Sequence, residues 1–503
     1  MPHQPDIATF TGLARTHTMV PVYRRLVGDT LTPVSAFCKL RQSGPAFLFE
    51  SVVGGERIGR YSFLGSNPIM TFEATRDQVR TTQGELTREV THADPLRLLE
   101  EYLAAHRGPQ LPGLPRFLGG AVGYAGYDTI RYVENLPNAP TDDRGLPDLS
   151  FAFYHLMVIF DHVEKTVIVL RNVATPKEAK LSAGDLQTMY TEACCDIDET
   201  VKRLRNVDDV LSFVDIDPGH VPAAGAPPES NCTQTEFEDA VRKAQQYILA
   251  GDIFQVVLSQ RFRRKTTAKP FDIYRALRVV SPSPFMFFVD TGTVTLIGAS
   301  PEIMCRVDHG VVTNRPLAGT RKRGKTEAED VALAEELKAD PKERAEHIML
   351  VDLARNDVGR VAEIGSVVIN DLLAVERYSH VMHLSSTVTG KLRSDLTPFD
   401  ALRASLPAGT LSGAPKVRAM EIIDELEPHR RGPYGGAVGY IDYAGNMDTC
   451  IALRTMVLKD GVADVQAGAG IVADSVPGDE YQETVNKAKS LLTALAVAET
   501  QLS

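Results

Sequence analysis

Two pairs of glutamates could together hold a metal ion. Glu343 and Glu346 are three residues apart, and so are Glu480 and Glu483. Residues three apart in a helix lie on one face, so each predicted helix would present two carboxylates side by side. Four such oxygen donors facing each other would suit a hard cation, and Mg²⁺ fits this donor set best. The alternative is a solvated acidic helix face, which is the commoner explanation of either pair taken alone.

The segment after Glu346 argues against a solvated face. Residues 348–351 are all apolar, so this helix is expected to be buried. A polar cluster follows them and would need partners inside the protein; its members are Asp352, Arg355, Asn356 and Asp357.

Three single residues could also do chemistry. His383 lies in the alternating stretch 378–389 and could act as a base near neutral pH, although a hydrogen-bonded core histidine is the commoner case. Glu302 follows Ala-Ser-Pro at the end of a predicted strand, where a buried carboxylic acid could stay protonated and donate a proton. Arg454 lies in a mostly apolar strand, so its guanidinium needs an anion, from the protein or from a substrate carboxylate.

Glycine-rich loops at 318–320, 408–416 and 466–470 could bring backbone N–H groups close to an anion. None matches a phosphate-binding loop or a dinucleotide-binding turn, which disfavours a nucleotide enzyme. The loops, the carboxylates and the arginine together indicate a small, multiply anionic, non-phosphate ligand.

These residues need a scaffold of interleaved helices and strands. Helices are predicted over 235–251, from 342 to 356 and from 479 to the C-terminus, and residues 186–204 form one buried helical face. Strands are predicted at 46–50, within 151–170, and at 254–262, 293–307 and 378–389. There is no regular βαβ period of about 30 residues, which favours an α+β fold with antiparallel sheets.

A proline-rich stretch at 217–230 reads as a linker and places a domain boundary near residue 225. We therefore expect two domains, 1–225 and 226–503. Two short motifs recur in the same order, 63–68 with 296–301 and 119–124 with 435–440. Either these are coincident glycine-rich turns or the two halves are built on related sheets.

Composition limits the classes of function. The chain has 503 residues, 43% apolar and 24% charged, which is typical of a globular protein. Its net charge of −11 disfavours nucleic-acid binding. No segment is apolar for long enough to span a bilayer, and no secretory signal is visible. Six scattered cysteines without a C-x-x-C pair indicate reduced thiols in a cytoplasmic protein.

Read together, these segments resemble the chorismate-utilising enzymes, and most closely the anthranilate synthase component I branch of that family. The resemblance is dense from 235 to 487 and looser before it. It rests on motifs at 251–259, 299–302, 315–321, 343–357, 381–383, 409–416, 434–440 and 466–470. It implies largely antiparallel sheets packed as a sandwich with helices outside, and an N-terminal regulatory domain.

The resemblance also implies a role for each site residue. Glu346 and Glu483, with Glu343 and Glu480 nearby, would hold Mg²⁺ against the ring carboxylate of chorismate. Glu302 would be the general acid, with His383 assisting pyruvate loss. The other implied residues are Thr410 in the catalytic set, and Gly319, Thr320, Tyr434, Arg454, Gly468, Ala469, Gly470 and Lys487 in the substrate-binding set.

Two positions separate the branches of this family. Members that add water to chorismate carry a lysine base where this chain has Gln255, and aminodeoxychorismate synthases carry a lysine nucleophile where it has Ala318. The resemblance therefore implies attack by ammonia itself. A glutamine amidotransferase subunit would supply the ammonia, since no cysteine here lies in a nucleophile-elbow turn.

Residues 47–51 resemble the family's tryptophan feedback site, with Ser51 as the matching residue. The second wall would be Pro284, Phe285 and Met286, where the family more often has tyrosine in the middle. Inhibition by tryptophan is therefore expected. Two alternatives stay open: an aminodeoxychorismate synthase component I, and a non-catalytic chorismate or tryptophan sensor.

Overall fold

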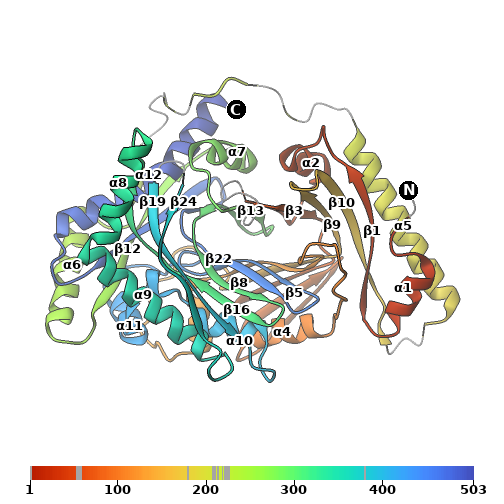
Figure 1. Cartoon of the computed structure of the whole chain (residues 1–503), viewed down its shortest axis with the longest axis horizontal. Helices are drawn as coiled ribbons and strands as arrows, with labels where there is room; N and C mark the ends of the chain where they lie inside the picture. The colour runs from red at the N-terminus through yellow and green to blue at the C-terminus, as the bar shows by residue number, and fades with distance from the viewer. Residues whose placement is uncertain are drawn as a thin grey trace.

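The computed structural model describes residues 3–51, 59–177, 181–206, 211, 214–217, 219, 227–378 and 381–502. Within these ranges the chain forms two large antiparallel sheets with helices packed outside them (Figure 1). This confirms the predicted α+β class. No helix in the described ranges is long and apolar enough to cross a membrane.

The first sheet has twelve strands within the described ranges, and β20 pairs with β12 beside its main path. In spatial order the strands are β1 (Met19–Val27), β10 (Thr166–Ala174), β9 (Leu156–Asp161), β3 (Tyr61–Ser66), β2 (Ala46–Glu50), β13 (Phe285–Asp290), β14 (Thr295–Ser300), β23 (Thr455–Lys459), β24 (Val462–Ile471), β12 (Gln255–Lys265) and β11 (Glu229–Ser230), with β20 (Gly413–Ala414).

The second sheet also has twelve strands in this part of the chain, with β18 pairing with β19 beside the path. In spatial order the strands are β17 (Leu317–Lys322), β19 (Val381–Lys391), β16 (Val311–Arg315), β15 (Ile303–Asp308), β22 (Met447–Ile451), β21 (Ala437–Asp442), β7 (Gly120–Ala125), β8 (Leu149–Tyr154), β4 (Met70–Thr75), β5 (Gln78–Gln83) and β6 (Leu86–Thr91), with β18 (Val368–Arg377).

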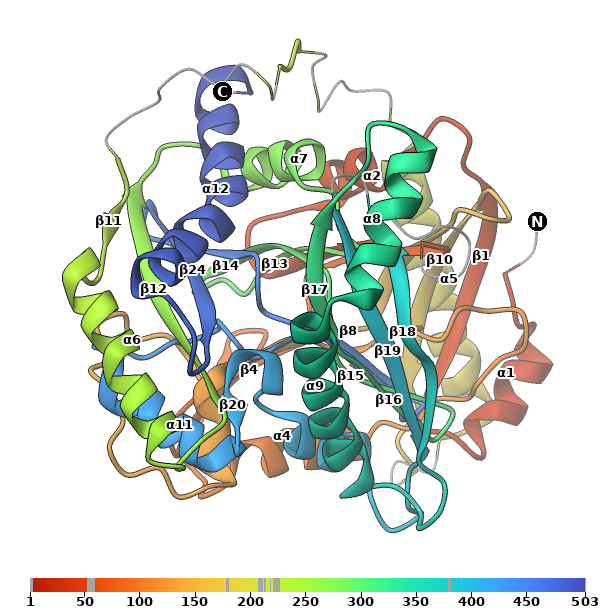
Figure 2. The ribbon, with the colours of Figure 1, turned by 60° about the vertical axis from the view of Figure 1, so that its left-hand side comes forward.

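Helices cover the outer faces of both sheets (Figures 1 and 2). They are α1 (Ile7–Ala14), α2 (Pro33–Leu40), α4 (Pro95–Ala104), α5 (Ala183–Arg205), α6 (Gln234–Leu249), α7 (Pro270–Val280), α8 (Glu327–Ala339), α9 (Pro341–Gly359), α10 (Pro398–Ser405), α11 (Lys416–Leu426) and α12 (Pro477–Gln501). The predicted helices at 235–251, 342–356 and 479 onward correspond to α6, α9 and α12, each within three residues at the bounds that the structure describes.

Both sheets take strands from either side of residue 225. In the first sheet β2 pairs with β13, with Leu48 opposite Phe288; in the second, β7 pairs with β21, with Gly123 opposite Gly439. The predicted boundary itself lies outside the described residues, so the division into two domains stays a prediction.

The recurring motifs occupy equivalent places around these two junctions. The segments 119–124 and 435–440 fall on β7 and β21, which pair with each other. The segments 63–68 and 296–301 fall on β3 and β14, which flank β2 and β13 in matching order. This placement favours two halves built on related sheets over coincidence.

One predicted strand is wrong. Residues 293–307 form two strands, β14 in the first sheet and β15 in the second, with Pro301 and Glu302 between them. The apolar alternation continues on both sides of this point, so the pattern alone did not reveal the break.

Candidate active site

Glu302 and Arg454 lie on two neighbouring connections between the sheets. The chain crosses from the first sheet to the second at Glu302 and returns between β22 and β23 at Arg454. The Ile451 amide donates to the Glu302 carbonyl at 3.0 Å, and the Ala299 amide donates to the Arg454 carbonyl at 3.0 Å. These two bonds hold the backbones of the candidate acid and the candidate anion-binding arginine together.

Glu302 is buried in a way that suits a general acid. Burial raises the pKa of its carboxyl from an ordinary 4.5 to about 8, because the charged form loses its hydration. The Thr410 hydroxyl donates to both carboxyl oxygens at 3.3 and 3.4 Å. With this pKa the carboxyl is mostly protonated at neutral pH, so it has a proton to give.

Arg454 is a half-buried cation with no protein counter-ion among the described residues. Burial holds the pKa of its guanidinium below the usual range, and across the described ranges no carboxylate forms an ion pair with it. Tyr434 is close enough to influence this pKa. The Tyr434 hydroxyl lies 2.9 Å from where a Cβ at Gly468 would sit, so this glycine leaves the hydroxyl its room. An anionic ligand would neutralise the arginine here.

His383 on β19 is held in one tautomer. Its Nδ1 lies 2.8 Å from the Gly319 carbonyl and 3.1 Å from the Thr320 hydroxyl. Because a carbonyl can only accept, Nδ1 carries the proton and Nε2 is the basic nitrogen. Burial lowers the pKa of the imidazole, which keeps the ring neutral. The imidazole and the Tyr378 ring meet edge to face, with their ring centres 5.7 Å apart.

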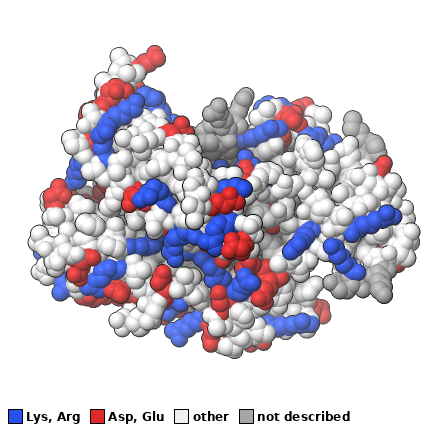
Figure 3. Space-filling view, turned by 60° about the horizontal axis from the view of Figure 1, so that its bottom comes forward, with Lys and Arg blue, Asp and Glu red and all other residues white. Residues whose placement is uncertain are grey.

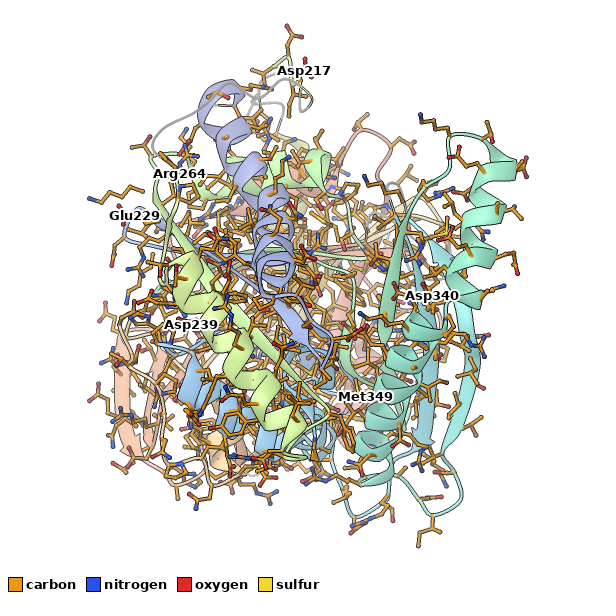
Figure 4. All side chains as sticks on the ribbon, turned by 90° about the vertical axis from the view of Figure 1, so that its left-hand side faces the viewer. Asp217, Glu229, Asp239, Arg264, Asp340 and Met349 are labelled. Carbon is orange, nitrogen blue, oxygen red and sulfur yellow. The ribbon has the colours of Figure 1, made fainter. Side chains whose placement is uncertain are left out.

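The glutamate pairs are on α9 and α12, as predicted. Helix α9 begins at Pro341, and the Asp340 side chain accepts the amides of Lys342 and Glu343. Figure 4 shows Asp340 at this end of α9 and Met349 farther along the same helix. Burial, together with the nearby carboxylates of Glu343 and Glu483, raises the pKa of Glu346. That influence shows that the two helices bring their carboxylates towards each other.

The four carboxylates do not share the same surroundings. Glu343 accepts from Arg321 at 3.0 Å, and Glu480 accepts from the Ser475 hydroxyl at 2.7 Å. Glu483 pairs with Lys487 at 2.6 Å, and the Lys487 ammonium also donates to the Gly468 carbonyl at 2.9 Å. Lys487 therefore links this acidic group to the glycine segment of β24.

The acidic group fits Mg²⁺ as part of a coordination shell. In the described part of the chain no three His, Cys, Asp or Glu side chains converge closely enough to hold a metal by themselves. Glu346 and Glu483 nevertheless offer hard oxygen donors, and Glu346 carries like-charge repulsion that a cation would relieve. A ligand carboxylate and water would have to complete the shell.

Gly319 joins the base to the carboxylates. Its carbonyl binds His383, and a Cβ at this position would lie 2.9 Å from a Glu343 carboxylate oxygen. Its φ of +64° also favours glycine. Through Gly319 the structure thus links the predicted base His383 to the predicted metal ligand Glu343.

The predicted regulatory residues lie on or directly beside the paired strands β2 and β13. Met286 on β13 is opposite Glu50 on β2, and Ser51 follows Glu50 directly. The Glu50 carboxylate accepts from the Tyr274 hydroxyl at 2.6 Å and pairs with Arg278 at 2.9 Å. On its other edge β13 pairs with β14, and Glu302 comes two residues after the end of β14.

Two side chains near this site were not singled out from the sequence, Tyr378 beside His383 and the buried Arg431 beside Tyr434. The spacing of Glu427 and Arg431, four residues apart, was the available signal. A cavity of about 350 Å³ lies away from this site: the proline-rich loop 108–119 lines it, and it contains none of the predicted site residues. A small cavity of about 30 Å³ lies beside Glu302 and Thr410.

The surface carries no large field of one sign on the face shown in Figure 3, where basic and acidic side chains are interleaved.

Comparison with known proteins identifies the family. Residues 44–493 match the model of the chorismate binding enzymes. The chain is 48% identical over 490 residues to anthranilate synthase component 1 of Acetivibrio thermocellus, covering 97% of each chain. It is 47% identical to the protein of that name from Pseudomonas aeruginosa, covering 96% of each. The crystal structure of anthranilate synthase component I from Streptococcus pneumoniae TIGR4 superimposes with a TM-score of 0.75 at 39% identity, covering 93% of this chain and 99% of that one. The chain therefore belongs to the family of chorismate binding enzymes.

Proposed function

We propose that the chain is the chorismate-converting component of an anthranilate synthase, which aminates chorismate with ammonia and releases pyruvate. The observation that carries this proposal is the buried Glu302, whose raised pKa favours the protonated form, beside Arg454, a cation for which the described residues provide no counter-ion. The names of the relatives support it. Gln255 and Ala318 support it too, because neither offers the lysine of the related reactions.

The side chains divide the reaction into two steps, an amination and an elimination. Arg454 and Tyr434 bind the enolpyruvyl carboxylate, and the backbone of 468–470 closes around it. Glu302 gives its proton to the C4 hydroxyl, which leaves as water while ammonia bonds to C2 and the double bonds shift; the ammonium group formed at C2 then gives up a proton, which restores the Glu302 acid. His383 takes the C2 proton through Nε2, the ether bond at C3 breaks, and the departing enolpyruvate gains a proton to become pyruvate as the ring becomes aromatic.

Mg²⁺ is the proposed cofactor, held by Glu346 and Glu483 with Glu343 and Glu480 behind them. When bound, it would supply positive charge for the ring carboxylate of chorismate. Glu346 in particular needs this charge, because burial and the nearby carboxylates of Glu343 and Glu483 raise its pKa, whereas Glu483 is already paired with Lys487.

The ammonia source is proposed to be a glutamine amidotransferase subunit. The names of the relatives, component 1, indicate that their enzymes have a further component. Burial raises the pKa of the Cys38 thiol to about 11 and of the Cys305 thiol to about 12, the opposite of what a nucleophilic cysteine needs. These thiols do not suit glutamine hydrolysis.

Feedback inhibition by tryptophan is the regulatory part of the proposal. Ser51, directly after β2, and residues 284–286, at the start of β13, would form its walls, and β2 and β13 pair with each other. The 1–225 segment would then carry the regulatory residues of one wall, and 226–503 the catalytic set.

The test is to incubate the purified chain with chorismate, Mg²⁺ and an ammonium salt at alkaline pH, and to follow anthranilate fluorescence. We expect anthranilate from ammonium, and none when glutamine replaces it. A non-aromatic amino product would instead indicate an aminodeoxychorismate synthase. Chorismate binding without any turnover would indicate a sensor. Glutamine-dependent turnover by the chain alone would contradict the proposed partner.

A further inference from the structure

Arg431 is a fully buried guanidinium beside Tyr434 of the candidate site. Its side chain is 2% exposed. Nε donates to Glu427 at 2.8 Å, and Nη2 donates to the other Glu427 oxygen at 2.5 Å. Nη1 donates to the Leu411 carbonyl at 2.6 Å, and Nη2 also donates to the Val257 carbonyl at 2.7 Å.

Two aromatic rings hold the plane of this guanidinium. Its central carbon lies 4.7 Å from the ring centre of Tyr127 and 5.6 Å from that of Tyr434. A planar fork of N–H groups has fixed directions, so the rings and the carbonyls together allow the side chain one orientation.

Glu427 extends the network into the first sheet. One of its oxygens accepts both the amide and the hydroxyl of Ser259, each at 2.8 Å. The Ser259 hydroxyl in turn accepts from Gln466 at 2.8 Å. The pair therefore has hydrogen bonds at both ends, which is what a buried ion pair requires to be tolerated.

Each partner of this pair adjoins a segment that the proposed function uses. Leu411 follows Thr410, which bonds to Glu302. Tyr434, a predicted substrate-binding residue, is one of the two rings that pack against the Arg431 guanidinium. On β12, Val257 is opposite Gly470 and Ser259 is opposite Gly468, so Arg431 and Glu427 hold the strand that pairs with the glycine segment of β24.

We infer that Arg431, paired with Glu427, is a positioning residue that holds three substrate-facing segments in register: the 409–411 turn, Tyr434 and the 468–470 stretch. This inference rests on the proposed function for the identity of the ligand. The Arg431 N–H groups donate to Glu427 and to two backbone carbonyls, and Tyr434 packs against the guanidinium, so we place Arg431 behind the substrate-facing segments. Its effect is therefore on ligand affinity and acid placement rather than on the chemistry directly.

The test compares Arg431→Lys with a matched control, Arg131→Lys. Arg131 also forms a buried ion pair with α11, bonding to Asp424 at 2.6 Å, but its contacts reach Asp128 and Leu136 and none of the three segments. At either position lysine keeps the positive charge but lacks the planar set of N–H donors of the guanidinium. A lost charged hydrogen bond is expected to cost a factor of about 10 to 100 in affinity when the partner carbonyl shifts.

We expect Arg431→Lys to raise the KM for chorismate about tenfold or more, with a smaller fall in kcat. Arg131→Lys should lower the thermal midpoint by about as much as Arg431→Lys does, and it should leave the KM for chorismate unchanged. Glu427→Gln, which keeps the shape and removes the charge, should raise KM in the same direction by less. If Arg431→Lys does not fold, Glu427→Gln carries the test.

Wild-type KM in folded Arg431→Lys and Glu427→Gln would overturn the inference and leave a purely structural ion pair. So would an equal rise in KM in the Arg131→Lys control. Calorimetric titration with chorismate separates this result from a failure of the proposed function, because it needs no turnover. A wild-type chain that binds chorismate without making anthranilate would refute the function, and the same variants would still be compared by their Kd.

Discussion

Replacing Glu302 with glutamine should stabilise the protein while it destroys the activity. Glutamine has the same shape and cannot ionise. Burial raises the pKa of Glu302 to about 8, whereas the unfolded chain has an ordinary value of 4.5. Between these values the unfolded chain releases a proton that the folded protein keeps, so stability falls as pH rises through this window.

The size of the effect follows from the two pKa values. Each pH unit between the two pKa values lowers the free energy of unfolding by about 1.4 kcal/mol. The loss due to this carboxyl is therefore roughly 1.4 kcal/mol at pH 5.5, ~3 kcal/mol at pH 7 and ~4.6 kcal/mol at pH 8.5. The Glu302→Gln variant removes this cost. Thr410 can still donate to the amide oxygen, so the hydrogen bond is largely retained. Turnover should fall by about 10²–10⁴-fold, because the amide has no proton to give.

The assay is the apparent thermal midpoint of both proteins from pH 5.5 to pH 8.5. The advantage of the variant should grow with pH and level off above pH 8. Glu335→Gln, at an exposed position on α8, is the control and should show no such growth. A difference between wild type and Glu302→Gln that does not change with pH, or a variant less stable at pH 8.5, would refute the assigned burial and protonation.

Three further changes test the other parts of the site. Glu346→Gln should nearly abolish turnover and leave the fold intact, because it removes a ligand charge from the cation; near wild-type rates at low Mg²⁺ would contradict the metal assignment. Ser51→Phe should weaken tryptophan inhibition with little change in the uninhibited rate, and inhibition curves that coincide with wild type would place the regulatory site elsewhere. His383→Met should slow pyruvate loss by about 10²-fold or more, so that chorismate is consumed and a non-aromatic amino intermediate accumulates; normal anthranilate formation, or no consumption of chorismate, would exclude the role given to Nε2.

The elements with strong periodicity could be predicted from the sequence. The spacing of Glu343 with Glu346, and of Glu480 with Glu483, placed them on single helix faces because α9 and α12 are long and regular. The alternation around His383 likewise matches β19. These local patterns depend on neighbouring residues, and so they can be read from one chain.

Two features of the site depend on contacts distant in sequence. The break at Glu302 arises because β14 and β15 join different sheets; Pro301 marks a strand end, but nothing in 293–307 shows that the next strand belongs to the other sheet. Arg431 was missed for a similar reason. An arginine is normally exposed, and its burial follows from carbonyls at Leu411 and Val257 that folding brings to it.

The joining of both sheets across the two halves of the chain has a consequence for biosynthesis. When residues 1–225 have left the ribosome, β2 and β7 still lack their partners β13 and β21, and the unpaired strand edges are open to association with other chains. The two sheets are complete only after strands more than 200 residues apart in sequence have paired. Folding is therefore expected to be slow relative to a protein with mostly local contacts. The first half made alone is therefore expected to aggregate unless a chaperone holds it. Release of a soluble, monomeric 1–225 fragment in a chaperone-free translation system would show that these edges are protected in another way.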